Sequence, residues 1–168
     1  MTKPLGSIRP GAWAAIDTNV LIYANQGRSS ECVDLLKRCA AGELQGVVPA
    51  PMAAELVHAL MLIEARENNW IERANPARSL AERPDLVRRL TRYEIQTREF
   101  LGIGLRVEPV SAGDILEALR VQKETGLLTN DALLLAVARR LNCEAVATAD
   151  KWIAGAAGFN VHAPTDLI

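Results

Sequence analysis

Short apolar segments alternate with longer segments of helical periodicity along most of this 168-residue chain. Parallel strands need long crossover connections, which are usually helices, so this alternation predicts a parallel sheet with helices on both faces. The expected strands are residues 13–16, 46–49, 107–110 and 144–149, and residues 159–161 are a candidate fifth strand. The sequence therefore predicts an α/β protein with three layers, α/β/α, around a central parallel β-sheet.

Helix start and stop signals divide the segments between these strands. Ser29 and Ser30, Pro51, and the Ser111-x-x-Asp114 pattern are each typical of a helix start. Asp114 is interpreted as part of a cap for this reason. The expected helical segments are 20–23, 30–41, 51–67, 84–101, 112–123 and 131–141, and residues 68–83, which are polar and contain Pro76, are expected to form a loop or a broken helix.

Length and composition indicate one domain in a reducing cytoplasm. We expect residues 1–12 to be a flexible lead-in and residues 13–168 to form a single domain. The N-terminus lacks the apolar core of a secretory signal, and no apolar run approaches the roughly 20 residues of a membrane helix. The three cysteines are odd in number and form no C-x-x-C motif, so structural thiols are favoured. A net charge of -1 does not indicate a strongly basic nucleic-acid binder.

Four carboxylates, Asp17, Glu55, Asp131 and Asp150, interrupt apolar stretches at well-separated places. A buried charge is costly unless it is paired or bound to a cation, and only Asp150 has a basic neighbour. Asp17 and Asp150 follow expected strands, whereas Glu55 and Asp131 lie near the starts of expected helices. Ligands of an open parallel sheet bind beyond the carboxyl ends of its strands. We therefore expect all four acids to converge there on a metal ion.

Each acid also has a purely structural interpretation. Asp17 can bond backbone amides in a turn, and Asp150 beside Lys151 can be a surface turn residue. Asp131 can complement a helix dipole, an effect worth about 0.3–1 kcal/mol. Glu55 is harder to explain in this way, because most residues three or four positions away on its helix are apolar. The joint pattern favours a shared site over four separate explanations.

A site made only of carboxylates selects a hard cation, Mg²⁺ or Mn²⁺, that keeps several water ligands. Without such a cation, the mutual repulsion of the acids would raise their pKa values. A divalent metal can activate water and stabilise phosphate oxygens during an in-line displacement. The predicted chemistry is hydrolysis of a phosphodiester or another phosphate ester.

The same residues carry a resemblance to a known family. Segments 16–21 (IDTNVL), 54–56 (AEL), 128–138 (LTNDALLLAVA) and 147–151 (ATADK) resemble the motifs of PIN-domain nucleases, in particular the VapC-like ribonuclease toxins of prokaryotic toxin–antitoxin pairs. Each motif is short, but their order, spacing and placement are specific together. The resemblance runs from about residue 14 to the C-terminus.

The resemblance implies a PIN-like α/β/α fold and an Mg²⁺- or Mn²⁺-dependent endoribonuclease. It implies that Asp17, Glu55, Asp131 and Asp150 are the catalytic, metal-binding acids, with Asn19 and Thr148 supporting the site. RNA would be the substrate, and a cognate antitoxin and a second copy of the chain would be the partners; no membrane is implied. A PIN nuclease that processes RNA without an antitoxin, and an inactive PIN-like binding module, are the alternatives.

Two departures from the compact family pattern concern the segment 68–106, which is longer than usual, and the nearly neutral charge. An RNA-binding protein needs basic contacts to phosphate. Local patches are available at Lys37-Arg38, at Arg88, Arg89 and Arg92, at Arg139-Arg140 and at Lys151.

Two other enzyme classes fit the sequence less well. A haloacid-dehalogenase-like phosphatase would need an acid at position 19, which is Asn. A receiver domain would need paired acids after its first strand and an Asp after its third, where this chain has Pro109-Val110-Ser111.

Overall fold

The computed structural model describes residues 2–156 and 158–167, and its centre is a six-stranded sheet in which every pairing is parallel. The strand order is β1-β6-β5-β2-β3-β4. The strands are β1 (Lys3–Pro4), β2 (Trp13–Ile16), β3 (Gln45–Pro49), β4 (Arg106–Glu108), β5 (Ala145–Ala147) and β6 (Val161–Ala163). The predicted α/β fold with a central parallel sheet is confirmed, with one strand more than the sequence indicated.

Apolar and mostly small residues build the three central strands. Residues 14–16 of β2, 46–49 of β3 and all of β5 are buried, as expected for strands covered on both faces. β2 lies between the other two, with Ala14 opposite both Gly46 and Ala145. The carboxyl ends of β2, β3 and β5 therefore meet at one edge of the sheet.

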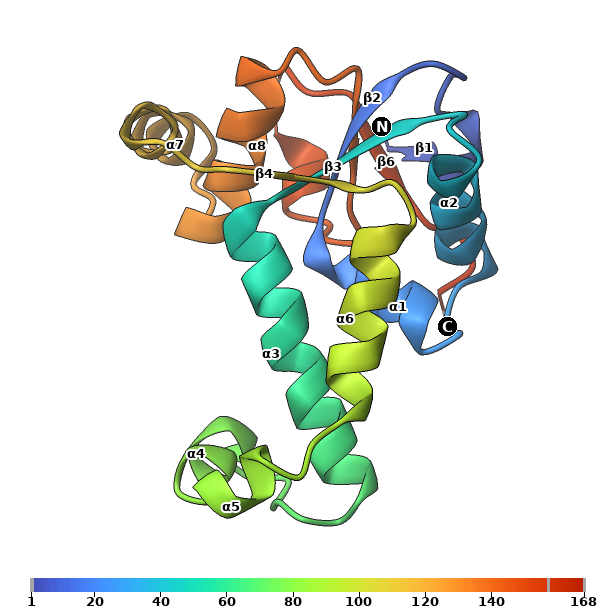
Figure 1. Ribbon diagram of the computed structural model, residues 1–168. Coiled ribbons are helices and arrows are strands. Elements are labelled where there is room, and N and C mark those ends of the chain that lie inside the picture. The colour runs from blue at the N-terminus through green and yellow to red at the C-terminus, as the bar shows by residue number, and fades with distance from the viewer. Residues whose placement is uncertain (1, 157, 168) are drawn as a thin grey trace.

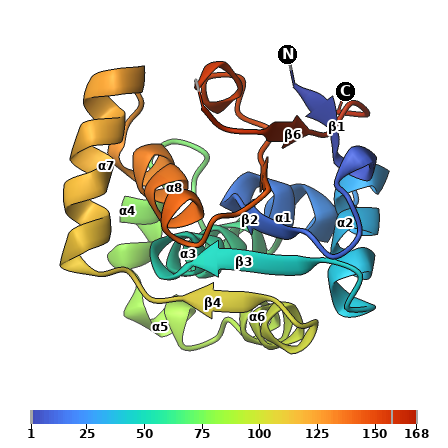
Figure 2. The ribbon, with the colours of Figure 1, turned by 90° about the horizontal axis from the view of Figure 1, so that it is seen from above.

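Helices flank this sheet on its two sides. The main ones are α1 (Thr18–Asn25), α2 (Ser30–Ala40), α3 (Ala50–Glu67), α7 (Ala112–Thr125) and α8 (Thr129–Arg140). In Figures 1 and 2, α7 and α8 lie on one side of the molecule, and α1 and α2 lie on the other. Residues 132–138 of α8 are all buried, which confirms the predicted buried helix.

Ion pairs and caps join α7 and α8 to β4. Ser111 and Asp114 form the capping box predicted for the start of α7. Arg140 of α8 donates to Asp114 Oδ1 at 2.6 Å and to Glu108 Oε1 at 2.8 Å. Asp114 and Glu108 are therefore satisfied structural acids.

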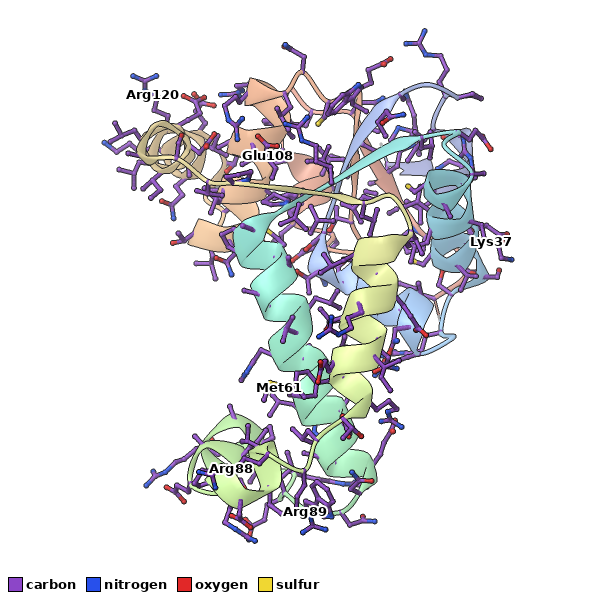
Figure 3. The ribbon with its side chains drawn as sticks, viewed as in Figure 1. Lys37, Met61, Arg88, Arg89, Glu108 and Arg120 are labelled. Carbon is purple, nitrogen blue, oxygen red and sulfur yellow. The ribbon has the colours of Figure 1, made fainter. Side chains whose placement is uncertain are left out.

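A helical extension projects away from the sheet and accounts for the long segment between β3 and β4. α3 and α6 (Arg92–Gly102) run side by side, and α4 (Pro76–Ala81) and α5 (Pro84–Val87) form its far tip, where Figure 3 shows Arg88 and Arg89 (Figures 1 and 3). A second apolar cluster, formed by Ala65, Leu80, Leu86 and Leu90, holds the tip together.

The single helix expected over 84–101 is wrong: the chain forms α5 and α6 with a break at residues 88–91. A residue of the neighbouring helix α3 stabilises this break. The buried Glu64 carboxylate accepts hydrogen bonds from the backbone N–H groups of Thr91 at 2.9 Å and Tyr93 at 2.8 Å. A carboxylate at a helix N-terminus satisfies free donors and complements the helix dipole. The expectation of a loop or broken helix over 68–83 agrees with the short α4.

The N-terminal residues expected as a flexible lead-in pack on the domain. Lys3 and Pro4 pair with His162 and Ala163 of β6, and a 3₁₀ turn, η1 (Leu5–Ser7), follows. Leu5 and Ile8 are buried in the main core. Pro4 is tolerated because β1 is an edge strand, where a missing N–H costs no ladder bond.

Among the residues that the structure describes, no helix is both long enough and apolar enough to cross a membrane.

Candidate active site

Asp17 and Asp150 follow the neighbouring central strands β2 and β5. The backbone N–H of Asp17, directly after β2, donates to the carbonyl oxygen of Ala147 at 2.9 Å. Ala147 is the last residue of β5, and Asp150 follows shortly after it. Because the two strands are parallel and in contact, both carboxylates lie at the same edge of the sheet.

Glu55 and Asp131 approach this edge from the starts of two helices. α3 begins directly after β3, so Glu55 lies in its second turn, and Asp131 lies in the first turn of α8. The Thr18 hydroxyl donates to the carbonyl oxygen of Met52 at 3.1 Å, which ties the start of α1 to the start of α3. This contact places the first turns of α3 beside Asp17.

The pKa values of Asp17 and Asp131 are raised, in part by the charges of neighbouring acids. Burial raises the pKa of Asp17 to about 6; a hydrogen bond from Thr148 opposes the rise, and the charges of Asp131 and Glu55 add to it. Burial also raises the pKa of Asp131, and the charges of Asp150 and Glu55 add to that rise. Like charges shift pKa values in this way only when they are close. Asp17 and Asp131 therefore lie within range of the charges of the other predicted acids, and a shared site of all four stays a prediction.

A hydrogen-bonded network links the ends of β2 and β5. Asp17 Oδ2 accepts from the Thr148 hydroxyl and from Asn19 Nδ2, both at 2.6 Å. Asn19 Oδ1 accepts the N–H of Ala149 at 2.9 Å, and Thr148 Oγ1 accepts the N–H of Asp150 at 3.0 Å. Asn19 and Thr148 therefore orient the side chain of Asp17 and the backbone that carries Asp150. Their role in catalysis stays a prediction.

A family model for the PIN domain matches residues 14–158. The chain belongs to the PIN domain family. This match confirms the family resemblance seen in the sequence. The nucleases of this family are hydrolases that act on nucleic acids. A search of curated proteins gave no match.

Solved structures share this PIN fold at low sequence identity. VapBC2 from Rickettsia felis, bound to a DNA fragment from its promoter, has a TM-score of 0.60 and 14% identity, covering 90% of this chain and 98% of the other. A toxin–antitoxin complex from Klebsiella pneumoniae has a TM-score of 0.54 and 19% identity, with coverage of 89% and 95%. PAE2754 from Pyrobaculum aerophilum has a TM-score of 0.55 and 18% identity, with coverage of 96% and 92%. These likenesses support the fold.

The donor set of this PIN domain suits a divalent cation. Within residues 2–156 and 158–167, no ion pair of a lysine or arginine involves any of the four acids, although Glu108 and Asp114 are both paired. In the same residues, no three His, Cys, Asp or Glu side chains form a ready-made metal site. Glu55 is exposed, and its Oε2 accepts from Asn130 Nδ2 at 3.2 Å. The uncompensated negative charge is the feature that fits a hard metal ion.

Most of the basic residues considered for nucleic-acid binding already have other partners. Ion pairs join Lys37 to Asp34, Arg38 to Glu43, Arg92 to Glu67, Arg139 to Glu117, and Arg140 to Glu108 and Asp114. Arg88 and Arg89 lie at the far tip of the helical extension (Figure 3). Lys151 directly follows Asp150, which makes it the basic residue that the sequence places beside the acids.

A pocket of about 320 Å³ opens beside two of the acids. Its walls include Asp131 and Asp150 together with the exposed side chains of Leu128 and Trp152. Neither apolar residue was among the site residues predicted from the sequence. Leu128 begins one PIN-like motif and Trp152 directly follows another, but their exposure depends on the fold, and no spacing rule in the sequence predicts it.

Proposed function

We propose that this PIN domain is a metal-dependent endoribonuclease that hydrolyses RNA phosphodiester bonds. The observation that carries the proposal is that the charges of Asp131 and Glu55 act on Asp17, and those of Asp150 and Glu55 act on Asp131, while none of the four has a basic ion-pair partner among the described residues. Protonation or a bound cation would relieve the repulsion between such half-buried carboxylates. The PIN family supports nucleic-acid hydrolysis as the use of that cation.

Each acid has a defined task in this proposal. Asp17 and Asp150 hold the principal Mg²⁺ or Mn²⁺, directly or through water, and Glu55 and Asp131 complete the cluster and orient or deprotonate the attacking water. The bound metal supplies stabilisation of charge on the phosphate and on the leaving 3′ oxygen. Thr148 and Asn19 restrain Asp17 by donating to its Oδ2. Since water attacks rather than the 2′-hydroxyl, the products carry 5′-phosphate and 3′-hydroxyl ends.

We further propose that the protein is the toxin of a toxin–antitoxin pair, acting in the cytoplasm as a homodimer that a cognate antitoxin silences. The support is the fold shared with VapBC2 and with the Klebsiella toxin–antitoxin complex. A PIN nuclease that processes RNA without an antitoxin is the second candidate. A neighbouring gene for a small DNA-binding protein would favour the toxin.

The test is cleavage of a cellular RNA pool by purified protein in Mg²⁺, in Mn²⁺ and in chelator. Asp17→Asn should lower the cleavage rate at least about 100-fold, because it removes an electrostatic contact to the reacting centre. Asp34→Asn is the matched control, since Asp34 is an exposed acid on α2. It should cleave like the unaltered protein.

Metal-dependent fragments absent from the Asp17→Asn reaction would support the nuclease. Fragments ending in 2′,3′-cyclic phosphate would contradict hydrolysis by water. Folded, antitoxin-free protein that cleaves nothing with either metal would favour the inactive binding module.

A further inference from the structure

Two of the most exposed apolar side chains of the described residues stand at the mouth of the acidic site. Trp152 is 72% exposed and Leu128 is 78% exposed, and both line the pocket that contains Asp131 and Asp150. A single exposed apolar side chain is ordinary, but two that line one pocket beside charged groups mark a candidate binding site. Because these apolar side chains lie next to the acids, the site suits a ligand that has an apolar face beside a charged group.

The backbone fixes Trp152 relative to Asp150. The N–H of Trp152 donates to Asp150 Oδ1 at 2.7 Å, and the N–H of Ala154 donates to the carbonyl oxygen of Asp150 at 3.2 Å. Ile153, the next residue, is fully buried and begins the short η2 helix (Ile153–Gly155). The indole ring is thus displayed by an anchored turn that is bonded to one of the catalytic acids.

Leu128, which lines the same pocket, is also held by the backbone around it. Gly126 ends α7 in the left-handed conformation with φ 76°, Leu127 is buried, and Leu128 is the extended residue that precedes α8. The carbonyl oxygen of Leu128 accepts the N–H of Ala132 at 2.9 Å, within the helical turn that carries Asp131. Both apolar side chains therefore keep a set position relative to an acid.

Lys151 adds a positive charge on the Trp152 side. Its Nζ lies 5.6 Å from the centre of the Trp152 ring, within cation–π range. A lysine beside an exposed aromatic ring is a combination that binds single-stranded nucleic acid, because the ring stacks on a base and the ammonium group attracts a phosphate.

We infer that Trp152, together with Leu128, holds an unpaired nucleobase next to the phosphate that is cleaved. This inference rests on the proposed nuclease function and assigns the side chains that hold the base beside the cut. A base in a duplex is already stacked between its neighbours, so it cannot present a face to Trp152 without being unpaired first. Stacking accepts any base, so the contact selects strandedness rather than sequence.

The first measurement is the cleavage kinetics of a short single-stranded RNA by the Trp152→Ala, Trp152→Phe and Leu128→Ala variants. Trp152→Ala should raise KM about tenfold or more, with a smaller change in kcat, as expected for loss of one stacking contact. Trp152→Phe should retain most of the affinity, because phenylalanine keeps an aromatic face. Leu116→Ala is the matched control, since Leu116 is 62% exposed on α7 and does not line the pocket.

The second measurement is binding without cleavage. Titrating Asp17→Asn protein with oligoadenylate should quench tryptophan fluorescence, and the quenching should disappear when Trp152→Phe is added. Annealing the RNA to its complement should abolish the quenching as well.

The two measurements separate the failure of the inference from that of the proposed nuclease. If oligoadenylate quenches Trp152 fluorescence but the unaltered protein cleaves no RNA, the nuclease proposal is overturned and the base contact is supported. Cleavage by unaltered protein with Trp152→Ala indistinguishable from Leu116→Ala would overturn the base contact and leave the ring for a protein partner. Equal impairment of Trp152→Ala and Trp152→Phe would also overturn stacking.

Discussion

The sheet edge and the helical extension each contain a carboxylate that is at least partly buried, and the pKa values of the two carboxylates are shifted in opposite directions. Asp17 at the sheet edge has a pKa raised to about 6 by burial, despite its bond from Thr148. For Glu64 in the extension, burial also favours the neutral form, but the backbone N–H groups of Thr91, Tyr93 and Arg92 outweigh it and lower the pKa. The hydrogen-bond partners of each acid, rather than its burial alone, therefore determine the direction in which its pKa is shifted.

The buried acids that join elements of the fold differ from the acids at the sheet edge in their hydrogen-bond and ion-pair partners. Glu64, Glu108 and Asp114 are buried acids with complete sets of donors or ion pairs, and each joins elements of the fold. The acids at the sheet edge have no basic ion-pair partners in the described part of the chain, and the pKa values of Asp17 and Asp131 are raised. An uncompensated charge costs stability, and the cation that we propose for this site would offset that cost.

The largest expected effect on stability comes from Glu64→Ala, which breaks the extension while leaving the sheet. The substitution leaves two backbone N–H groups at the start of α6 without their acceptor. Hydrogen bonds to charged groups contribute about 1.5–3 kcal/mol each, so we expect a loss of about 3–6 kcal/mol. Hydrogen exchange should accelerate in α4, α5 and α6 but not in β2 or β5.

Glu64→Gln is the matched control, because it keeps an acceptor and loses the charge. The pKa of Glu64 is lowered on folding, so its stabilisation is present above the ordinary value of 4.5 and is lost as the pH falls through the folded pKa. Uniformly faster exchange across the whole chain in Glu64→Ala would contradict the division into two regions.

A smaller effect, on the sheet, is expected from Gly46→Ala in β3. An added Cβ would lie 2.6 Å from Leu105 Cδ2, 2.9 Å from Cys39 Sγ and 3.0 Å from Ile16 Cδ1. Overpacking of this kind costs about 1–3 kcal/mol, more than the gain from restricting the unfolded chain. Chemical denaturation should show the loss as a lower global unfolding midpoint.

The control for Gly46→Ala lies in the extension. Gly102, at the end of α6, has open space where a Cβ would be, so Gly102→Ala should be neutral or slightly stabilising. Equal midpoints for the two variants would show that β3 can relax around the extra methyl group.

The sheet body was predictable from sequence because its signals are local. Apolar runs at 13–16, 46–49 and 144–149 gave strands within a few residues of their true ends, and 107–110 and 159–161 were displaced by one and two residues at their starts. The placement of the four acids was predictable for a related reason. Strand ends and helix starts meet at one edge of a parallel α/β sheet, and Asp17 and Asp150 follow strands whereas Glu55 and Asp131 lie near helix starts. That they form one metal site stays a prediction.

The extension and the termini were less predictable because distant residues determine them. The pattern over 84–101 is compatible with one helix, and the break depends on Glu64, far away in the sequence. β1 has no strand pattern of its own and exists because β6 offers an unpaired edge. The exposure of Trp152 likewise depends on how the turn after β5 is anchored, which periodicity does not reveal.

The smallest effect concerns a second helix cap that comes from far along the chain, at the C-terminus. Asp166 accepts from the Ser29 hydroxyl at 2.6 Å, from the N–H and hydroxyl of Ser30, and from the N–H of Glu31 at 3.2 Å, all at the start of α2. The Ser29 bond is the main cause that lowers the pKa of Asp166 from 3.8 to about 2. Unlike Glu64, this carboxylate is open to water, so its loss should cost less.

Asp166→Asn should therefore lower the melting temperature at neutral pH by less than Glu64→Ala does. A lowered pKa means that the stabilisation is complete above about 4 and is lost as the pH falls toward about 2. The difference between the unaltered protein and Asp166→Asn should shrink over that interval, whereas Asp34→Asn, on the same helix, should show no comparable change. If the difference in melting temperature stays constant down to pH 2, the C-terminal segment holds α2 by packing alone. Asp166 would then not stabilise a helix start by its charge as Glu64 does.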